Sequence, residues 1–155
     1  MKKQIDLVEE CLIEAQKAYK KGEVPIGAIV VKNGKIISRA YNTREHSQNA
    51  LHHAEIIAIN KACKKLKSWR LDDCEMFVSL EPCPMCAGAI LNCRLKKINI
   101  LCLDDNYGAV MSKYHLLDDN ALNHKTEVEY IENPKSKQLI QSFFKNIRKN
   151  KSKPN

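Results

Sequence analysis

The sequence predicts an α/β fold in which a mixed sheet of five strands is covered on both faces by helices. Two observations lead to this prediction. Short apolar, β-rich segments alternate along the chain with segments whose apolar residues recur every three or four positions. The first two strands are separated by a two-residue turn signal, so that this pair forms a hairpin. The length of 155 residues is that of about one domain.

The first part of the chain is predicted to form a helix and then a hairpin. Apolar residues at three- and four-residue steps predict an amphipathic helix over residues 3–20, and Gly22 suits its C-terminal cap. The segment 26–31 is β-rich, and Asn33-Gly34 is a strong hairpin signal before a strand at 36–38.

The remaining elements alternate between helix and strand. Helices are predicted over residues 53–66, 84–93 and 136–149. Strands are predicted over residues 76–80, 97–102 and 128–131. Strands that alternate with helices in this way imply a sheet with helices on both faces.

Two short motifs supply a set of metal ligands. His53-Ala54-Glu55 is followed, thirty positions on from its histidine, by Pro82-Cys83-Pro84-Met85-Cys86. A catalytic zinc typically has three protein ligands and a water in the fourth position, whereas a structural zinc is closed by four ligands. The cation lowers the pKa of that water, so that hydroxide exists near neutral pH. We therefore expect one Zn²⁺ per chain on His53, Cys83 and Cys86, with Glu55 moving the proton of the water to a leaving amine.

Other interpretations of the cysteines explain less. A structural site of four cysteines would need Cys93 and Cys102, which lack the close pairing usual in such sites. A redox pair would account for Cys83 and Cys86 but would leave the His-Ala-Glu motif without a role. The other five cysteines occur singly in apolar or helical segments, and we expect them to be reduced packing residues: Cys11, Cys63, Cys74, Cys93 and Cys102.

Both motifs are expected where helices begin. Pro82 precedes a helix whose first turn holds Cys83, and His53 starts another helix. Helix N-termini favour anions, so they stabilise the thiolates that a metal requires. Because an ideal helix points residues two positions apart to different sides, we expect His53 and Glu55 at the irregular entrance of their helix.

The charge balance indicates a polyanionic partner. Lys and Arg number 26 against 18 Asp and Glu, and the net charge is +8. The segment 143–155 holds five basic residues and no acidic one, and a second basic group follows the His-Ala-Glu motif: Lys61, Lys64, Lys65, Lys67 and Arg70. Patches of one sign attract phosphate backbones, although a well-solvated surface would also give a positive balance.

The sequence indicates a cytoplasmic protein without a membrane partner. No stretch approaches the ~18 apolar residues of a membrane span, and Asp6 makes the N-terminus acidic too early for a signal peptide. We expect one zinc-dependent catalytic domain over residues 1–149 and a basic tail over residues 150–155.

With these residues in view, the chain resembles the bacterial tRNA-specific adenosine deaminases of the cytidine deaminase-like superfamily, from about Glu9 to Lys149. The H-x-E…P-C-x-x-C pattern is shared by zinc nucleobase deaminases in general. The segments 122–124 and 143–148 are more particular to the tRNA enzymes. The resemblance implies a three-layer α/β/α homodimer that converts the wobble adenosine of an arginine tRNA to inosine by hydrolysis, with the tRNA anticodon stem-loop as its partner.

The resemblance also implies a set of substrate contacts. Six positions match residues that contact the substrate in the family: Asn42 for the purine, Val24 and Leu80 for the walls of the base pocket, Asp104 for an anticodon-loop sugar, and Asn123 and Phe144 for nucleotides. Four of these side chains also have an ordinary interpretation. The asparagine at 42 suits a turn, and the apolar residues suit a hydrophobic core.

Two departures and two rival functions complete the prediction. The segment 101–112 lacks the Lys and the second Gly of the usual family loop, and the segment 133–136 replaces an acidic helix start.

The nearer rival function is that of a deaminase of guanine or another free nucleobase or nucleoside, which would not need a basic tail. The second is a non-catalytic RNA-binding zinc protein, against which Glu55 argues because a structural zinc needs no such carboxylate.

Overall fold

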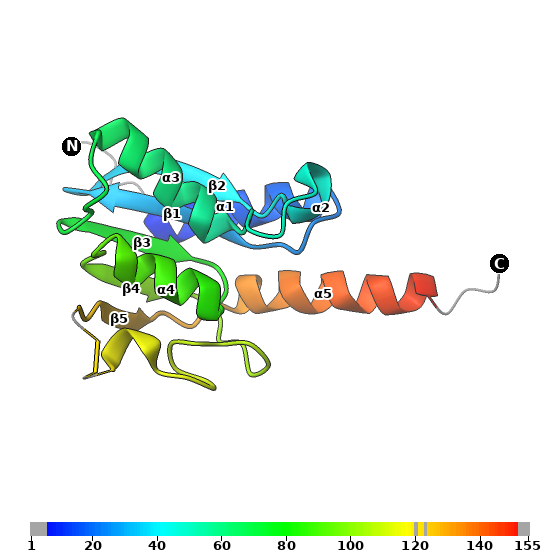
Figure 1. Ribbon diagram of the computed structural model, residues 1–155. Coiled ribbons are helices and arrows are strands. Elements are labelled where there is room, and N and C mark those ends of the chain that lie inside the picture. The colour runs from blue at the N-terminus through cyan, green and yellow to red at the C-terminus, as the bar shows by residue number, and fades with distance from the viewer. Residues whose placement is uncertain (1–5, 120, 123, 152–155) are drawn as a thin grey trace.

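The computed structural model describes residues 6–119, 121–122 and 124–151. Its strands are β1 (Gly27–Lys32), β2 (Lys35–Tyr41), β3 (Cys74–Val78), β4 (Lys97–Ile100) and β5 (Glu127–Tyr130). They form one sheet in the order β2-β1-β3-β4-β5, as Figure 1 shows. Strand β1 pairs antiparallel with β2 and β3, whereas β3, β4 and β5 run parallel. The predicted mixed five-stranded sheet is confirmed.

Helices cover the sheet on both sides. They are α1 (Leu7–Lys20), α2 (Arg44–Ser47), α3 (Ala54–Leu66), α4 (Pro84–Asn92), the 3₁₀ helix η1 (Leu116–Asp118) and α5 (Pro134–Lys151). Helices α3 and α4 lie on one face, while α1 lies on the other and contacts α5 (Figure 1). The predicted three-layer arrangement is therefore confirmed. No helix of the described residues is long and apolar enough to cross a membrane.

The two core regions follow from the alternation of side chains along the central strand β1. Ala28 and Val30 belong to the larger core under α3 and α4. Ile29 and Val31 belong to the smaller core under α1. Since successive side chains of a strand point to opposite faces, a strand covered on both sides must be apolar at every position. All seven cysteines are free.

The predicted elements are correct in type and differ at their ends. Residues 3–5 of the first predicted helix lie outside the described residues; that helix is capped by Asp6, whose Oδ1 accepts the Glu9 amide at 3.1 Å. The predicted strands 76–80 and 97–102 end two residues earlier, at Val78 and Ile100. Helices α2 and η1 were not predicted, because their three or four residues are too few for an apolar period.

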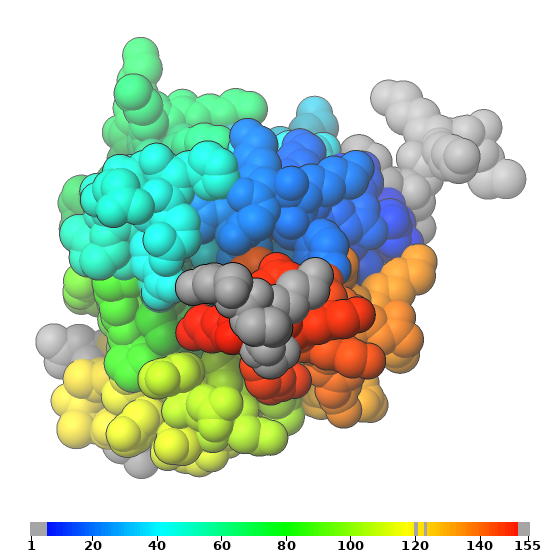
Figure 2. Space-filling view, turned by 90° about the vertical axis from the view of Figure 1, so that its right-hand side faces the viewer, coloured from blue at the N-terminus to red at the C-terminus, as the bar shows by residue number. Residues whose placement is uncertain are grey.

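One end of the molecule collects the segments that will form the site. Here the carboxyl ends of the parallel strands β3 and β4 meet the first turns of α3 and α4, and α5 passes alongside (Figure 1). Figure 2 looks onto this end, where the last turns of α5 (red) lie at the centre, residues 42–48 (cyan) to the upper left and residues 104–112 (yellow-green) below. Ligand sites of open α/β sheets commonly lie at such carboxyl ends.

Candidate metal centre and active site

Two helix starts bring together the three predicted metal ligands. His53 is the N-cap of α3, and Cys83 is the N-cap of α4, with Pro84 in the first turn after it. Cys86 lies in the first turn of α4 and is fully buried. Extended backbone angles at both N-caps turn the side chains of His53 and Cys83 out of their helices. This agrees with the prediction that the His-Ala-Glu motif lies at an irregular helix start.

The spacing of the donor atoms fits a tetrahedral metal ion. Nδ1 of His53 lies 3.6 Å from Sγ of Cys83 and 3.5 Å from Sγ of Cys86. All three donor atoms lie within 4.8 Å of one another. Zinc–nitrogen and zinc–sulfur bonds of ordinary length at the tetrahedral angle place nitrogen and sulfur about 3.6 Å apart. The donor set and its geometry therefore fit one zinc-like cation with a fourth position left open.

The pKa values of the two cysteine thiols are shifted in opposite directions. The hydrogen bond from Cys86, and after it the one from His53, lowers the pKa of Cys83 to about 4. The Cys83 sulfur and burial raise the pKa of Cys86. Because a metal binds the thiolate form of cysteine, a cation at this cluster would bind with release of protons.

Glu55 is a buried carboxylate aimed at the same place. It lies in the first turn of α3 and is 3 % exposed. Burial raises its pKa to about 7, and the neighbouring Cys83 acts in the same direction. Its Oε1 atom is buried and has no hydrogen-bond partner among the described residues. Because buried polar atoms are normally satisfied, an orphaned oxygen here indicates a place for a ligand or a water.

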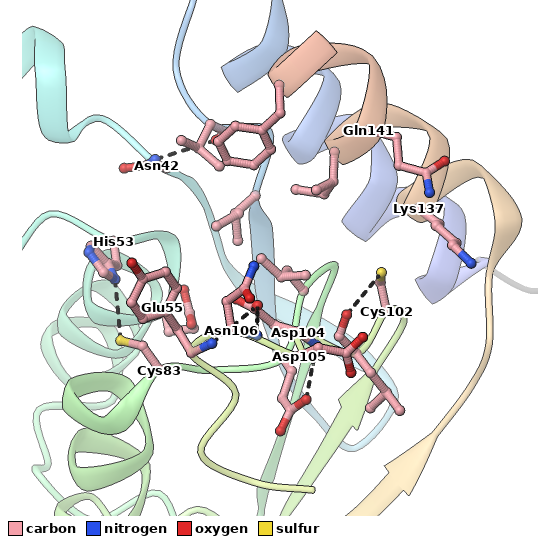
Figure 3. A pocket seen from close by; sticks show the side chains of 18 of the residues that line it. Asn42, His53, Glu55, Cys83, Cys102, Asp104, Asp105, Asn106, Lys137 and Gln141 are labelled. Atoms are coloured by element: carbon pink, nitrogen blue, oxygen red, sulfur yellow. Dashed lines mark hydrogen bonds between the residues drawn. The ribbon is translucent and has the colours of Figure 1, made fainter. Parts of the chain in front are cut away.

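A cavity of about 800 Å³ opens above these residues (Figure 3). We use the name floor for His53, Glu55 and Cys83, which line the cavity, together with the buried Cys86 that completes the cluster. We use the name mouth for the exposed lining residues of the 104–112 loop and of α5: Asp105, Asn106, Tyr107, Lys137, Gln141 and Phe144. The cavity also includes five of the six positions that the family resemblance singles out: Val24, Asn42, Leu80, Asp104 and Phe144. Asn123 lies outside the described residues.

Asn42 both shapes a turn and lines the cavity. It is 4 % exposed, and its Oδ1 accepts the Arg44 amide at 3.0 Å. Its Nδ2 donates a longer hydrogen bond of 3.4 Å to the carbonyl of Val24. The turn therefore fixes the side chain at the cavity wall, where Figure 3 shows it on the far side from the Asp104 segment.

The two neighbouring phenylalanines of α5 have different environments. Phe143 is buried and its ring meets that of Tyr19 edge to face, with centroids 6.4 Å apart. Phe144 is 42 % exposed and lines the mouth. The Phe144 ring also meets that of Phe143 edge to face, with centroids 5.4 Å apart, but much of it stays accessible at the cavity.

Two buried carboxylates near the cavity were not predicted. Glu23, beside Val24, is 1 % exposed and accepts the amides of Glu45 and His46 at 3.0 and 2.8 Å. Burial alone would raise its pKa, but these hydrogen bonds hold the pKa of Glu23 below its ordinary value. Glu81, between Leu80 and Pro82, is 3 % exposed. The sequence carried a signal for both acids, because Glu23 directly precedes Val24 and Glu81 directly follows Leu80, and both neighbours are predicted pocket residues.

The second basic group does not lie at the cavity. It occupies the last turns of α3 and the segment after it, whereas His53 caps the first turn. Thirteen residues of helix separate the two ends by about 20 Å. In Figure 1 the cavity end and this end of α3 lie on opposite sides of the molecule. Nearness in sequence to the metal motif therefore did not mean nearness in space.

Comparisons with known proteins agree with this site. The family model of the MafB19-like deaminases matches residues 3–148. A tRNA-specific adenosine deaminase of Aquifex aeolicus is 43% identical over 139 residues, which cover 90% of this chain and 92% of that protein.

Solved structures show that deaminases of more than one substrate class share this fold. One from studies of A-to-I editing by tRNA:A34 deaminases at the wobble position of transfer RNA has a TM-score of 0.82 and 33% identity, and covers 86% of this chain and 97% of its own. A guanine deaminase of Bacillus subtilis is 29% identical with a TM-score of 0.61, over 96% of both chains. With its open His/Cys/Cys cluster and its adjoining buried glutamate, the chain belongs to the tRNA-specific adenosine deaminases within the MafB19-like deaminase family.

Proposed function

We propose that this protein binds one Zn²⁺ per chain on His53, Cys83 and Cys86 and hydrolytically deaminates adenosine to inosine at the wobble position of a tRNA, an arginine tRNA in particular. One observation carries the proposal: the unpartnered Oε1 of Glu55 lies beside a three-donor metal cluster at the floor of a cavity of about 800 Å³. Such a cavity is large enough to take a purine nucleoside.

Zinc bound at this cluster would supply the Lewis acidity that makes water a nucleophile near neutral pH. Glu55 moves the protons. Its carboxylate takes one from the attacking water and gives a proton to N1 of the purine. It then takes the remaining proton from the new C6 hydroxyl group and delivers it to the exocyclic nitrogen, so that the C6–N bond breaks, the C6 carbonyl forms and ammonia leaves. A carboxyl group whose pKa is about 7 can both accept and release a proton at neutral pH.

The remaining cavity residues hold the base. A base inside a stacked loop cannot reach the floor, so the target nucleotide must be extruded into the cavity. We assign Asn42 to the purine and Val24 and Leu80 to the walls of its pocket. Asp104, Asn123 and Phe144 are assigned to the sugar and nucleotides of the anticodon loop, as the family resemblance implies.

The basic end of α5 is assigned to the phosphates of the anticodon stem. The last turn of this helix carries Arg148, Lys149 and Lys151. The catalytic domain would then comprise residues 1–149, and residues 150–155 a basic tail. The homodimer that the resemblance implies is part of the same proposal and predicts the mass of two chains in solution.

The test is the appearance of inosine at the wobble position of a transcribed arginine tRNA after incubation with the zinc-loaded protein. A tRNA with guanosine at that position serves as the matched control. Deamination of free guanine without turnover of the tRNA would assign the protein to the free-base rival instead. Tight tRNA binding without any turnover would assign it to the non-catalytic rival.

A further inference from the structure

Tyr107 is an exposed aromatic residue at the mouth that packing does not explain. Its side chain is 70 % exposed, yet it lines the cavity that holds Glu55. Among the described residues no aromatic ring or cation packs on its ring; the ring and cation contacts involve other residues. Phe144 lines the same cavity from α5, so two exposed rings approach the mouth from separate elements.

The loop that carries Tyr107 is anchored by the buried carboxylate of Glu81. Oε1 of Glu81 accepts the amide of Asp104 at 3.0 Å and the hydroxyl of Ser112. Oε2 accepts the amides of Val110, Met111 and Ser112 at 3.1, 2.7 and 2.9 Å. These contacts fix both ends of the 104–112 loop. Hydrogen bonds to a charged acceptor are stronger than neutral ones, so the loop is held firmly.

Contacts within the loop fix the tyrosine itself. The Oδ1 atom of Asp104 accepts the amides of Asn106 and Tyr107, at 3.0 and 3.3 Å. Gly108 packs so closely that a Cβ atom there would lie 2.4 Å from both the Asp104 carbonyl and Oε1 of Glu81. The exposed ring therefore projects from a rigid backbone, and a rigid aromatic anchor loses little entropy when it binds a partner.

The charge of the loop restricts the ligand. Asp104 and Asp105 precede Tyr107, and no basic residue occurs between positions 104 and 112. Acidic side chains repel a phosphate backbone, whereas an aromatic ring stacks on any nucleobase. Apart from the sugar contact assigned to Asp104, the part of an RNA that this loop accepts is therefore the face of an unpaired base.

We propose that Tyr107 is a specificity-determining residue that stacks on the unpaired base next to the target adenosine, and that Glu81 is the positioning residue that holds it there. The inference rests on the proposed function, since it requires an RNA loop in the cavity. Extrusion of the target base leaves its neighbour with one uncovered face, and an aromatic side chain at the mouth can cover it.

The experiment measures the affinity of an anticodon stem-loop for the full-length, zinc-loaded protein and for Tyr107→Ala and Tyr107→Phe, together with the single-turnover rate at saturating RNA. Loss of one stacked base should weaken binding by about 5- to 150-fold in Tyr107→Ala. Tyr107→Phe keeps the ring and should bind like the unaltered protein. The saturated rate should stay unchanged in both variants, because neither alters the floor.

A second set of stem-loops identifies the base. Each carries one abasic nucleotide, either directly 5′ or directly 3′ of the target adenosine. With one of these RNAs the unaltered protein and Tyr107→Ala should bind equally, since the stacking partner is already missing. Equal affinity of both proteins for the intact stem-loop would overturn the inference, as would a difference between them that survives both abasic substitutions.

Glu81→Gln tests the positioning role. It places an amide nitrogen against backbone donors, so the loop should loosen and RNA binding should weaken while zinc content stays unchanged. In the Tyr107→Ala background the same substitution should cost less affinity than it does in the unaltered protein, because only the sugar contact assigned to Asp104 is then left to lose, and full additivity would contradict positioning through this ring. If the unaltered protein turns over the stem-loop and the tyrosine variants bind normally, only this inference fails. If the unaltered protein does not turn over the stem-loop, the proposed function fails and this inference with it.

Discussion

The floor and the mouth of the cavity are built in different ways. The floor comes from a three-residue motif and a five-residue motif, each at the start of a helix. Its Glu55 side chain is buried, with 3 % exposed. The mouth comes from a loop and a long helix, and its rings at positions 107 and 144 are 70 % and 42 % exposed. Bond making needs donor atoms fixed to within a fraction of an ångström, whereas recognition of a large partner needs accessible surface. The comparison predicts that changes in the two regions have separable effects.

The largest effect should follow removal of a metal ligand. His53→Ala, Cys83→Ala and Cys86→Ala should each lose both zinc and deaminase activity, because two ligands do not retain a catalytic zinc. Elemental analysis and an inosine assay measure the two losses. Cys63→Ala, which changes a cysteine far along α3, is the matched control and should keep both. Full zinc occupancy in all three ligand variants would refute the assignment.

Removal of the proton carrier should act on chemistry alone. Glu55→Ala should lower the single-turnover rate by about 10²- to 10⁴-fold, and toward the upper end because one carboxylate serves several proton transfers. Zinc content and RNA affinity should match those of the unaltered protein. Glu55→Gln, which keeps the volume of the side chain, should show the same loss of rate. A near-normal rate in the zinc-loaded alanine variant would remove Glu55 from the mechanism.

Shortening of the basic helix should act on binding alone. Truncation after Ile147 removes four cations: Arg148, Lys149, Lys151 and Lys153. Each lost phosphate contact should flatten the dependence of log affinity on log salt by about 0.9, or nearer 0.7 for single-stranded stretches. Affinities for the stem-loop at several salt concentrations measure this slope. An unchanged slope would leave the tail with a role in solubility only.

The smallest effect is expected at the far end of α3. Replacement of Lys61, Lys64, Lys65 and Lys67 by glutamine removes four positive charges, as many as the truncation does. These residues lie in the later turns of α3 or just after it, roughly 12 to 21 Å along the helix axis from His53 and so beyond the ~8 Å screening length at physiological salt. The salt slope should therefore match that of the unaltered protein. A fall as large as that of the truncation would show that net charge, and not the position of α5, controls RNA affinity.

The sequence was sufficient to predict that the side chains of the floor come together, because the signals are local. The three predicted ligands and the carboxylate occur in two short motifs, and the start of a helix fixes each motif in space. The sheet was predictable for a similar reason, since β1 is apolar at nearly every position and a tight turn joins it to β2. Both predictions depended on residues that are neighbours along the chain.

The mouth was not predictable to the same extent. Glu81 binds amides 23 to 31 positions further along the chain, and no periodic pattern marks such contacts. Phe143 and Phe144 are adjacent, so only the packing of α5 against Tyr19 distinguishes the buried ring from the exposed one. The lysines after the His-Ala-Glu motif seemed near the site in sequence, but the length of α3 carries them away from it.

The separation of chemistry from recognition is tested most directly by one pair of variants on one substrate. Dissociation constants and saturated single-turnover rates for an anticodon stem-loop are measured with Glu55→Ala and Phe144→Ala, both loaded with zinc. Glu55→Ala should bind normally and react at least a hundredfold more slowly, whereas Phe144→Ala should bind more weakly and react at the normal rate once saturated. A saturated rate for Phe144→Ala as low as that for Glu55→Ala would contradict the division between floor and mouth.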